Sequence, residues 1–325
     1  MMELLESLEI NSQIDSFRIE AIVARSGMAS TYRATDLRDN RIVALKFPHP
    51  EMEADPIFSE RFQREARIGE RLIHPKVMRV LDGEKHDRSY IVMEWCEGCP
   101  LRKIHNEGRI PRDRAIRIAL DILDALVYIH ANGVVHHDLK PENIMVDAED
   151  KIKLIDFGIA SDSAAQRQTH DVSATILGTP NYTSPEQVNG KRGDERSDVY
   201  SVGIILYEML TGKLPFSDPA PWAAMNERLS NGPVPPRVVD PSISPQLEEV
   251  ILRALERNPK NRYPAARDFL WDLEHLNQVG VEDRAELLRW KEHKSKISRN
   301  ILCYSVLALF PVVMLLLLFL TGRLQ

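Results

Sequence analysis

The sequence predicts an α+β chain with a small strand-rich lobe, a larger helical lobe and a C-terminal transmembrane helix. Apolar and polar residues alternate in several short segments before residue 50, and helical periodicity dominates beyond residue 95. Residues 301–320 carry no charge and are rich in leucine and valine, and twenty such residues can span a bilayer core as a helix.

The small lobe is predicted to begin with three strands and to continue with a helix. The strand segments are 17–25, 29–36 and 41–48, and Asp39-Asn40 supplies turn residues between the last two. Residues 57–72 are predicted to be helical because apolar side chains recur there at helical spacing.

The large lobe is predicted to contain two long buried helices. Residues 115–130 keep apolar side chains on one face, and residues 198–210 are apolar with few charges. With 43% hydrophobic residues among 325, the chain can bury a core of this kind.

The composition excludes two classes of partner or scaffold. The 42 basic and 48 acidic residues give a net charge of −6, so no nucleic-acid partner is expected. Three cysteines are too few for a disulfide framework. Cys96 and Cys99 form a C-x-x-C pair, which is interpreted as packing rather than metal or redox chemistry because no second Cys or His pair lies nearby.

Two short motifs place proton-accepting and metal-binding side chains at a fixed spacing. Residues 136–143 read HHDLKPEN, and Asp156-Phe157-Gly158 begins thirteen residues after Asn143. Asp138 can accept a hydroxyl proton, and the oxygens of Asn143 and Asp156 suit a Mg²⁺ ion on the phosphates of ATP.

With further motifs in the same order, the chain resembles the bacterial-type (Hanks-type) Ser/Thr protein kinases. Val43-Ala44-Leu45-Lys46 is similar to the VAIK motif, and residues 178–187 read GTPNYTSPEQ. The resemblance covers residues 17–276 and implies the bilobal protein-kinase fold, with lobes at 17–95 and 96–276. It also implies an ATP-dependent protein kinase that uses Mg²⁺, or Mn²⁺ in its place, on Ser and Thr of protein substrates.

The resemblance implies a role for each residue of these motifs. Lys46 is expected to contact the α- and β-phosphates and to pair with Glu65, nineteen residues later. Asp138 is expected to accept the hydroxyl proton, and Lys140 to neutralise the transferring γ-phosphoryl group. Thr179 is expected to bond Asp138 and to sense the acceptor.

The resemblance also implies the metal ligands, Asn143 and Asp156, and a set of residues that contact the nucleotide. That set is Val23, Ala24, Ser26, Gly27, Thr31, Ala44, Lys46, Met93, Glu94, Cys96, Asn143, Met145 and Asp156.

Three residues are expected to support the large lobe. The resemblance implies a salt bridge between Glu186 and Arg262, which lies in the string NPKNRYP. Asp198 is expected to anchor the backbone of the catalytic loop, or to be a carboxylate favoured by the dipole at a helix N-terminus, and both can hold together.

The phosphate loop departs from the G-x-G-x-x-G pattern, because Ala24, Ser26 and Ala29 stand at the glycine positions and Gly27 lies beside them. Alanine and serine leave some room for a phosphate and lose conformational freedom. Weaker nucleotide binding is one hypothesis, and sufficiency of small residues is the other.

A second departure is His137, which stands where the kinases it resembles usually have arginine. Histidine is charged only part of the time near neutral pH, so loose dependence on loop phosphorylation is expected. Thr169, Ser173 and Thr175 are candidates for autophosphorylation.

Two alternative functions come from other classes. A catalytically impaired, membrane-tethered pseudokinase scaffold is favoured only by the altered phosphate loop. A small-molecule phosphotransferase shares the H-x-D-x-x-x-x-N loop, but the KPEN and GTP to SPE strings resemble a site for a protein substrate.

The segments outside the kinase-like region suggest a single-pass membrane protein. Residues 1–16 form an N-terminal segment, 277–300 a juxtamembrane linker, 301–320 the span and 321–325 a short tail. Lys291, Lys294, Lys296 and Arg299 precede the span and only Arg323 follows it, which predicts a cytoplasmic kinase domain. A bacterial plasma membrane and self-association are further expectations, and a buried core helix is the alternative for 301–320.

Overall fold

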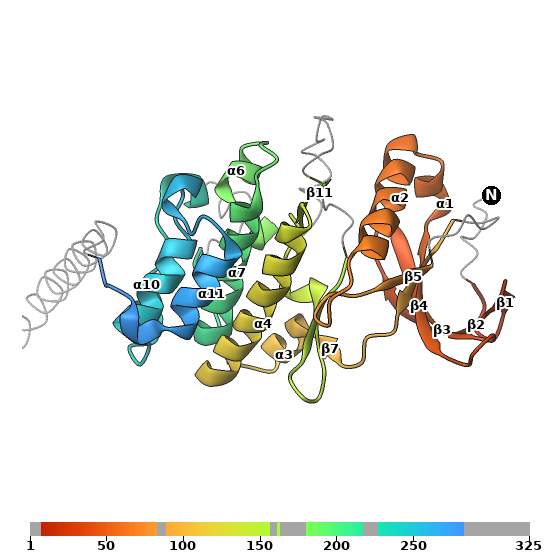
Figure 1. Ribbon diagram of the computed structural model, residues 1–325, viewed down its shortest axis with the longest axis horizontal. Helices are drawn as coiled ribbons and strands as arrows, with labels where there is room; N and C mark the ends of the chain where they lie inside the picture. The colour runs from red at the N-terminus through yellow and green to blue at the C-terminus, as the bar shows by residue number, and fades with distance from the viewer. Residues whose placement is uncertain (1–7, 83–88, 157–160, 163–179, 217–226, 283–325) are drawn as a thin grey trace, which may run out of the picture. The chain divides into compact units, whose positions relative to one another are not determined.

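The computed structural model describes residues 8–82, 89–156, 161–162, 180–216 and 227–282 (Figure 1). Met1–Val279 form one compact unit, and a second unit begins at Gly280. All of the elements described below belong to the first unit.

The small lobe is built on an antiparallel sheet with the strand order β1-β2-β3-β4-β6-β5. Its strands are β1 (Gln13–Ile14), β2 (Phe17–Arg25), β3 (Ala29–Asp36), β4 (Ile42–Pro48), β5 (Val80–Asp82) and β6 (Ile91–Glu94). The predicted strands 17–25 and 29–36 are confirmed, and the third begins at Ile42 rather than Arg41. Asn40 forms the preceding turn with φ of 61°, a conformation that Asn tolerates better than most residues.

Two helices follow β4, namely α1 (Pro50–Glu53) and α2 (Pro56–Arg71). Asp55 caps α2 by accepting a hydrogen bond from the backbone N–H of Ile57, and Pro56 occupies the first turn. The helix buries Phe62, Glu65 and Ile68, and Phe62 packs with residues of the sheet. The burial of Glu65 among apolar residues marks α2 as part of a site.

The large lobe consists mostly of helices. They are α3 (Leu101–Asn106), α4 (Arg112–Ala131), α6 (Pro185–Val188), α7 (Glu195–Thr211), α9 (Pro236–Val239), α10 (Pro245–Ala254) and α11 (Ala266–Glu274), with 3₁₀ turns η1 (Pro141–Asn143), η2 (Pro180–Tyr182), η3 (Pro259–Asn261) and η4 (Leu276–Gln278). The two predicted helices are confirmed as α4 and α7. Helix α7 begins three residues earlier than predicted, because Asp194 caps it at the N–H of Arg196.

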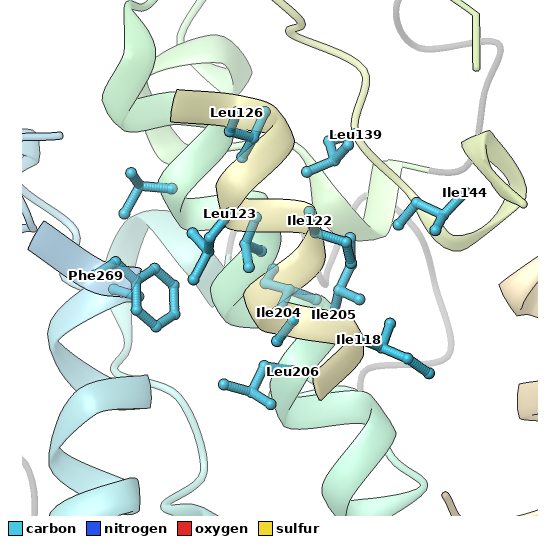
Figure 2. Packing of buried hydrophobic residues seen from close by; sticks show 14 of the residues in the cluster. Ile118, Ile122, Leu123, Leu126, Leu139, Ile144, Ile204, Ile205, Leu206 and Phe269 are labelled. Carbon is cyan, nitrogen blue, oxygen red and sulfur yellow. The ribbon is translucent and has the colours of Figure 1, made fainter. Parts of the chain in front are cut away.

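The core of this lobe forms where α4 meets α7 and α11 (Figure 2). Ile122, Leu123, Ile204, Ile205 and Phe269 are fully buried there. Helix α7 is buried around its whole circumference for most of its length, which explains why its sequence lacks a polar stripe.

Short strands position the loops between the lobes. One small sheet has the order β10-β9-β7 and another pairs β11 with β8, from β7 (Cys99–Pro100), β8 (Val134–Val135), β9 (Ile144–Val146), β10 (Ile152–Leu154) and β11 (Ser161–Asp162). The predicted catalytic loop, residues 136–143, lies between β8 and β9, and Asp156 follows β10. The backbone N–H of Ile155 donates to the carbonyl of Asn143 over 2.9 Å, which joins the two motifs.

Among the described residues, no helix combines the length and the apolarity that a bilayer crossing requires. The predicted span at 301–320 and the tail at 321–325 lie outside the described residues, as does most of the linker at 277–300.

The predicted salt bridge between Glu186 and Arg262 is present in the large lobe. Arg262 donates from Nη1 to Oε1 over 2.7 Å and from Nη2 to Oε2 over 2.8 Å, and its side chain is fully buried. Burial by itself would raise the pKa of Glu186, but the hydrogen bonds and charge of Arg262 hold it below its usual value. Arg262 also donates to the carbonyls of Glu256 and Arg196.

Removing one partner of this buried pair should destabilise the large lobe, because the other charge stays buried and unpaired. We expect Arg262→Ala to lower the free energy of unfolding by about 3–5 kcal/mol in urea titrations. Arg112→Ala is the matched control, since Arg112 is exposed and pairs with exposed Asp113, and it should cost less than about 1 kcal/mol. Equal losses for the two variants would contradict a special role for the buried pair.

Candidate active site

Three elements converge on the ammonium group of Lys46. Lys46 lies on β4, Glu65 on α2 and Asp156 directly after β10. Lys46 Nζ donates to Glu65 Oε1 over 2.6 Å and to Asp156 Oδ1 over 3.0 Å. The side chains of Lys46 and Glu65 are 16% and 7% exposed, so this ion pair is poorly screened by water.

The electrostatics of this group favour a charged lysine. Burial by itself would lower the pKa of Lys46, but the charges and hydrogen bonds of Asp156 and Glu65 raise it above its ordinary value. Burial, with the neighbouring charge of Asp156, raises the pKa of Glu65 to about 7 despite the attraction of Lys46. The lysine is therefore a permanent cation, and the protonation of Glu65 varies near neutral pH.

Asp198, in the first turns of α7, holds the backbone of the catalytic loop. Its carboxylate is fully buried and accepts the backbone N–H groups of His136 and His137, each over 2.9 Å. His130 Nε2, on α4, lies 2.9 Å from Asp198 Oδ2. Burial opposes ionisation, but the hydrogen bond from His130 and the charges of the three histidines lower the pKa of Asp198 to about 2.

Both expectations for Asp198 therefore hold. It is a carboxylate near a helix N-terminus, and it fixes the loop backbone. His137 has φ of 64°, a conformation that costs energy for residues other than glycine. The hydrogen bond from the His137 N–H to Asp198 and the bond from Gln187 Nε2 to the His137 carbonyl over 2.9 Å hold this peptide in place.

The loop places Asp138, Lys140 and Asn143 together, as predicted from the motif. Lys140 Nζ donates to Asp138 Oδ2 over 2.6 Å, and Asn143 Nδ2 donates to the carbonyl oxygen of Asp138 over 2.9 Å. The Asp138 side chain is 34% exposed, so it is accessible to a hydroxyl group. Asn143 also connects this loop to the site around Lys46, because its carbonyl accepts the backbone N–H of Ile155, the neighbour of Asp156.

Asn143 and Asp156 have the chemistry of Mg²⁺ ligands. The Asn143 amide donates through Nδ2, which leaves Oδ1 as its metal-binding atom. Asp156 has φ of 66°, and in this conformation its carboxylate reaches Lys46. One carboxylate and one amide oxygen suit Mg²⁺, because nucleotide phosphates and water usually complete its coordination.

The predicted phosphate loop is the hairpin between β2 and β3. Ser26 Oγ accepts the backbone N–H groups of Met28 over 3.2 Å and Ala29 over 3.0 Å, and it donates to the Ala29 carbonyl. Gly27 does not have positive φ, and a Cβ atom there would meet nothing within 4 Å. The serine side chain, rather than glycine, therefore closes this turn, and weaker nucleotide binding stays a prediction.

Other residues predicted to contact the nucleotide lie on β2, β3, β4, β6 and β9. Met93 is buried, and the Glu94 carboxylate accepts from Lys153 Nζ over 2.7 Å and from the Arg79 N–H over 2.8 Å. Thus the Glu94 side chain joins β6 to β10, and the Glu94 backbone N–H donates to the Arg79 carbonyl over 3.0 Å. Val23 is 51% exposed on β2, and Thr31 on β3, Ala44 on β4 and Met145 on β9 complete the predicted set.

The cysteine pair lies between β6 and α3, where Cys99 begins β7. Cys96 and Cys99 are free thiols, and burial raises the pKa of Cys96 to about 12, so its thiol stays protonated. The described residues contain no group of three or more His, Cys, Asp or Glu side chains that could hold a metal ion.

Several predicted residues lie outside the described part of the chain. They are Phe157, Gly158, Gly178, Thr179 and the candidate phosphorylation sites Thr169, Ser173 and Thr175.

Other residues that support the site were missed from the sequence. Gln187 on α6 bonds the His137 carbonyl of the loop, Arg102 on α3 contacts Glu142 of the same loop, and His130 on α4 contacts Asp198, which holds the loop backbone. His130 and Arg102 belong to none of the motifs above, and Gln187 ends the GTPNYTSPEQ string without a role assigned to it. The partners of all three are 40–68 residues away in the sequence.

Comparisons with known proteins agree with this geometry. Residues 17–270 match the protein kinase domain family. The chain is 38% identical over 290 residues to the serine/threonine-protein kinase PknB of Mycolicibacterium smegmatis, covering 87% of this chain and 46% of that protein. It is 40% identical over 268 residues to PknB of Mycobacterium leprae, covering 80% of this chain and 42% of that protein.

The chain thus spans less than half the length of these two relatives. Among solved structures, the crystal structure of the Mycobacterium tuberculosis PknI kinase domain superimposes with a TM-score of 0.65 at 25% identity, covering 83% of this chain and all of that chain. The converging motif residues, the family match over 17–270 and these relatives show that the chain belongs to the protein kinase domain family.

Proposed function

We propose that the chain is a protein serine/threonine kinase that transfers the γ-phosphoryl group of ATP to Ser and Thr hydroxyls of proteins. The observation that carries this proposal is the Lys46 ammonium held between Glu65 and Asp156, with Asp138, Lys140 and Asn143 close by on the loop. Relatives named serine/threonine-protein kinases support the choice of acceptor.

In the proposed reaction, the acceptor oxygen attacks the γ-phosphorus, the bond from that phosphorus to the β–γ bridging oxygen breaks, and ADP leaves. Asp138 accepts the hydroxyl proton, and Lys140 stabilises the charge on the transferring group. Lys46 orients the α- and β-phosphates, and Asn143 and Asp156 would hold Mg²⁺. When bound, the metal ion neutralises charge on the phosphate oxygens.

The carboxylate of Asp138 should be indispensable for transfer. We expect Asp138→Asn to lower the rate of label transfer from γ-labelled ATP to the chain itself and to a generic basic protein by about 10²–10⁴-fold. Asp39→Asn, at a turn of the small lobe, is the matched control and should keep the wild-type rate. Absence of transfer by folded wild-type chain with either Mg²⁺ or Mn²⁺ would overturn the proposed function.

The ionisation of Glu65 should set the acid limb of the pH profile. Since its raised pKa is about 7, the carboxylate becomes protonated as pH falls, and its ion pair with Lys46 weakens. From about pH 8 to about pH 6 the ionised fraction, and with it kcat/KM for ATP, should fall about tenfold. Glu65→Gln should be less active and lack this step, and an unchanged slope in that variant would show that another group titrates.

We also infer that residues 301–320 tether the kinase domain to a membrane. The support is their length, their lack of charge and the basic residues that precede them. In bacterial cells, the full chain should remain in the membrane fraction after an alkaline wash. Leu309→Lys combined with Val313→Lys should release it, because each buried charge costs about 2.5–3.5 kcal/mol at a span centre. Soluble wild-type chain would contradict the tether.

A further inference from the structure

The turn between β2 and β3, residues 26–29, binds two of its own backbone N–H groups through the side chain of Ser26. Its Oγ accepts the N–H of Met28 over 3.2 Å and that of Ala29 over 3.0 Å. The Ser26 backbone N–H and the Ser26 hydroxyl donate in return to the Ala29 carbonyl, over 2.9 Å and 3.0 Å. Two donors of the predicted phosphate loop are thus bonded within the loop itself.

The sheet register places this turn beside the lysine that is proposed to orient the phosphates. Thr31 lies opposite Lys46 across the β3–β4 pair and opposite Ala24 across the β2–β3 pair. The turn begins two residues after Ala24 and ends two residues before Thr31. In protein kinases the loop at this place covers the nucleotide phosphates, and backbone N–H groups are suitable donors to them. The N–H groups of Met28 and Ala29 are therefore donors that a phosphate would use.

The backbone that carries these two donors is fixed from the end of β4. The His49 N–H donates to the Met28 carbonyl over 2.9 Å, and His49 Nε2 lies 3.0 Å from Ser30 Oγ. Ala29 and Ser30 are buried, whereas Ser26 is exposed. The smallest movement that releases the two N–H groups is consequently a rotation of the Ser26 hydroxyl, and the backbone can stay in place.

We propose that the Ser26 hydroxyl competes with the nucleotide phosphates for the N–H groups of Met28 and Ala29, and thereby lowers the affinity of the kinase for ATP. A charged phosphate oxygen is a stronger acceptor than a neutral hydroxyl, so ATP displaces the side chain. Part of the binding free energy is then offset by the two hydrogen bonds that are lost. Ser26 acts through backbone groups and is a positioning residue. This inference rests on the proposed kinase function.

Ser26→Ala removes the competing hydroxyl and keeps both backbone donors. Ser26 does not have positive φ, so alanine can adopt its backbone conformation. The buried N–H of Ala29 loses the hydroxyl as its acceptor, and a phosphate oxygen compensates that loss. In calorimetric titrations of the full chain with Mg²⁺ and a non-hydrolysable ATP analogue, we expect the variant to bind about three- to tenfold more tightly than the wild type.

Three controls separate this competition from a general change in the nucleotide site. Adenosine has no phosphate, so its affinities for the wild type and Ser26→Ala should agree within about twofold. Ser26→Thr keeps a hydroxyl group and should retain the wild-type affinity for the analogue. Ser12→Ala should retain it too, because this change removes a hydroxyl that donates to the Glu9 carbonyl in another turn of the small lobe.

Unchanged or weaker binding of the analogue by folded Ser26→Ala would overturn the proposal, since weaker binding would mean that the hydroxyl assists phosphate binding. Equal tightening for adenosine, or the same tightening in Ser26→Thr, would also overturn it. Wild-type chain that binds neither the analogue nor adenosine would overturn both this inference and the proposed function. Tighter binding by Ser26→Ala without any phosphoryl transfer by the wild type would count against the proposed function alone.

Discussion

The carboxylate of Asp198 lies fully buried on α7, and the catalytic loop is suspended from it by the N–H groups of His136 and His137. A buried charge of this kind is tolerated only when its hydrogen bonds are complete. Since α7 is surrounded by the core of the large lobe, the loop backbone is attached to a deeply buried helix. Asp138 and Asn143 can therefore keep their positions although both lie on an irregular segment.

The cost of burying a charge is also compensated by partners at Lys46. Lys46 loses hydration on burial, and two carboxylates from different elements compensate it. Since Glu65 comes from α2 and Asp156 from the end of β10, the ion pairs exist only when strand, helix and loop are docked. The Glu94 to Lys153 pair, from β6 to β10, adds a second connection between the two lobes. The arrangement of the lobes is thus coupled to the electrostatics of the nucleotide site.

Two further arginines pair with carboxylates in the large lobe. Arg262 binds Glu186 of α6, and Arg102 links Glu142 to Glu208 and Tyr182. The two arginines differ in exposure, since the Arg262 side chain is fully buried and that of Arg102 is 25% exposed. The first therefore lies wholly in the interior of the lobe, whereas the second is partly exposed to solvent.

The sequence by itself determined the strands at 17–25 and 29–36 and the long helices. It also singled out Lys46, Glu65, Asp138, Asn143 and Asp156 as candidate site residues. These features depend on local periodicity, capping and short motifs, which are written in neighbouring residues. The start of α7 was missed by three residues because a cap, not apolar periodicity, sets it. The closure of the phosphate loop by Ser26, the support of the loop by His130 and Gln187, and the partners of Arg102 were decided only by the tertiary structure. Each of these depends on which backbone groups and side chains meet in space, and the energies of such contacts arise from burial that no single segment possesses alone.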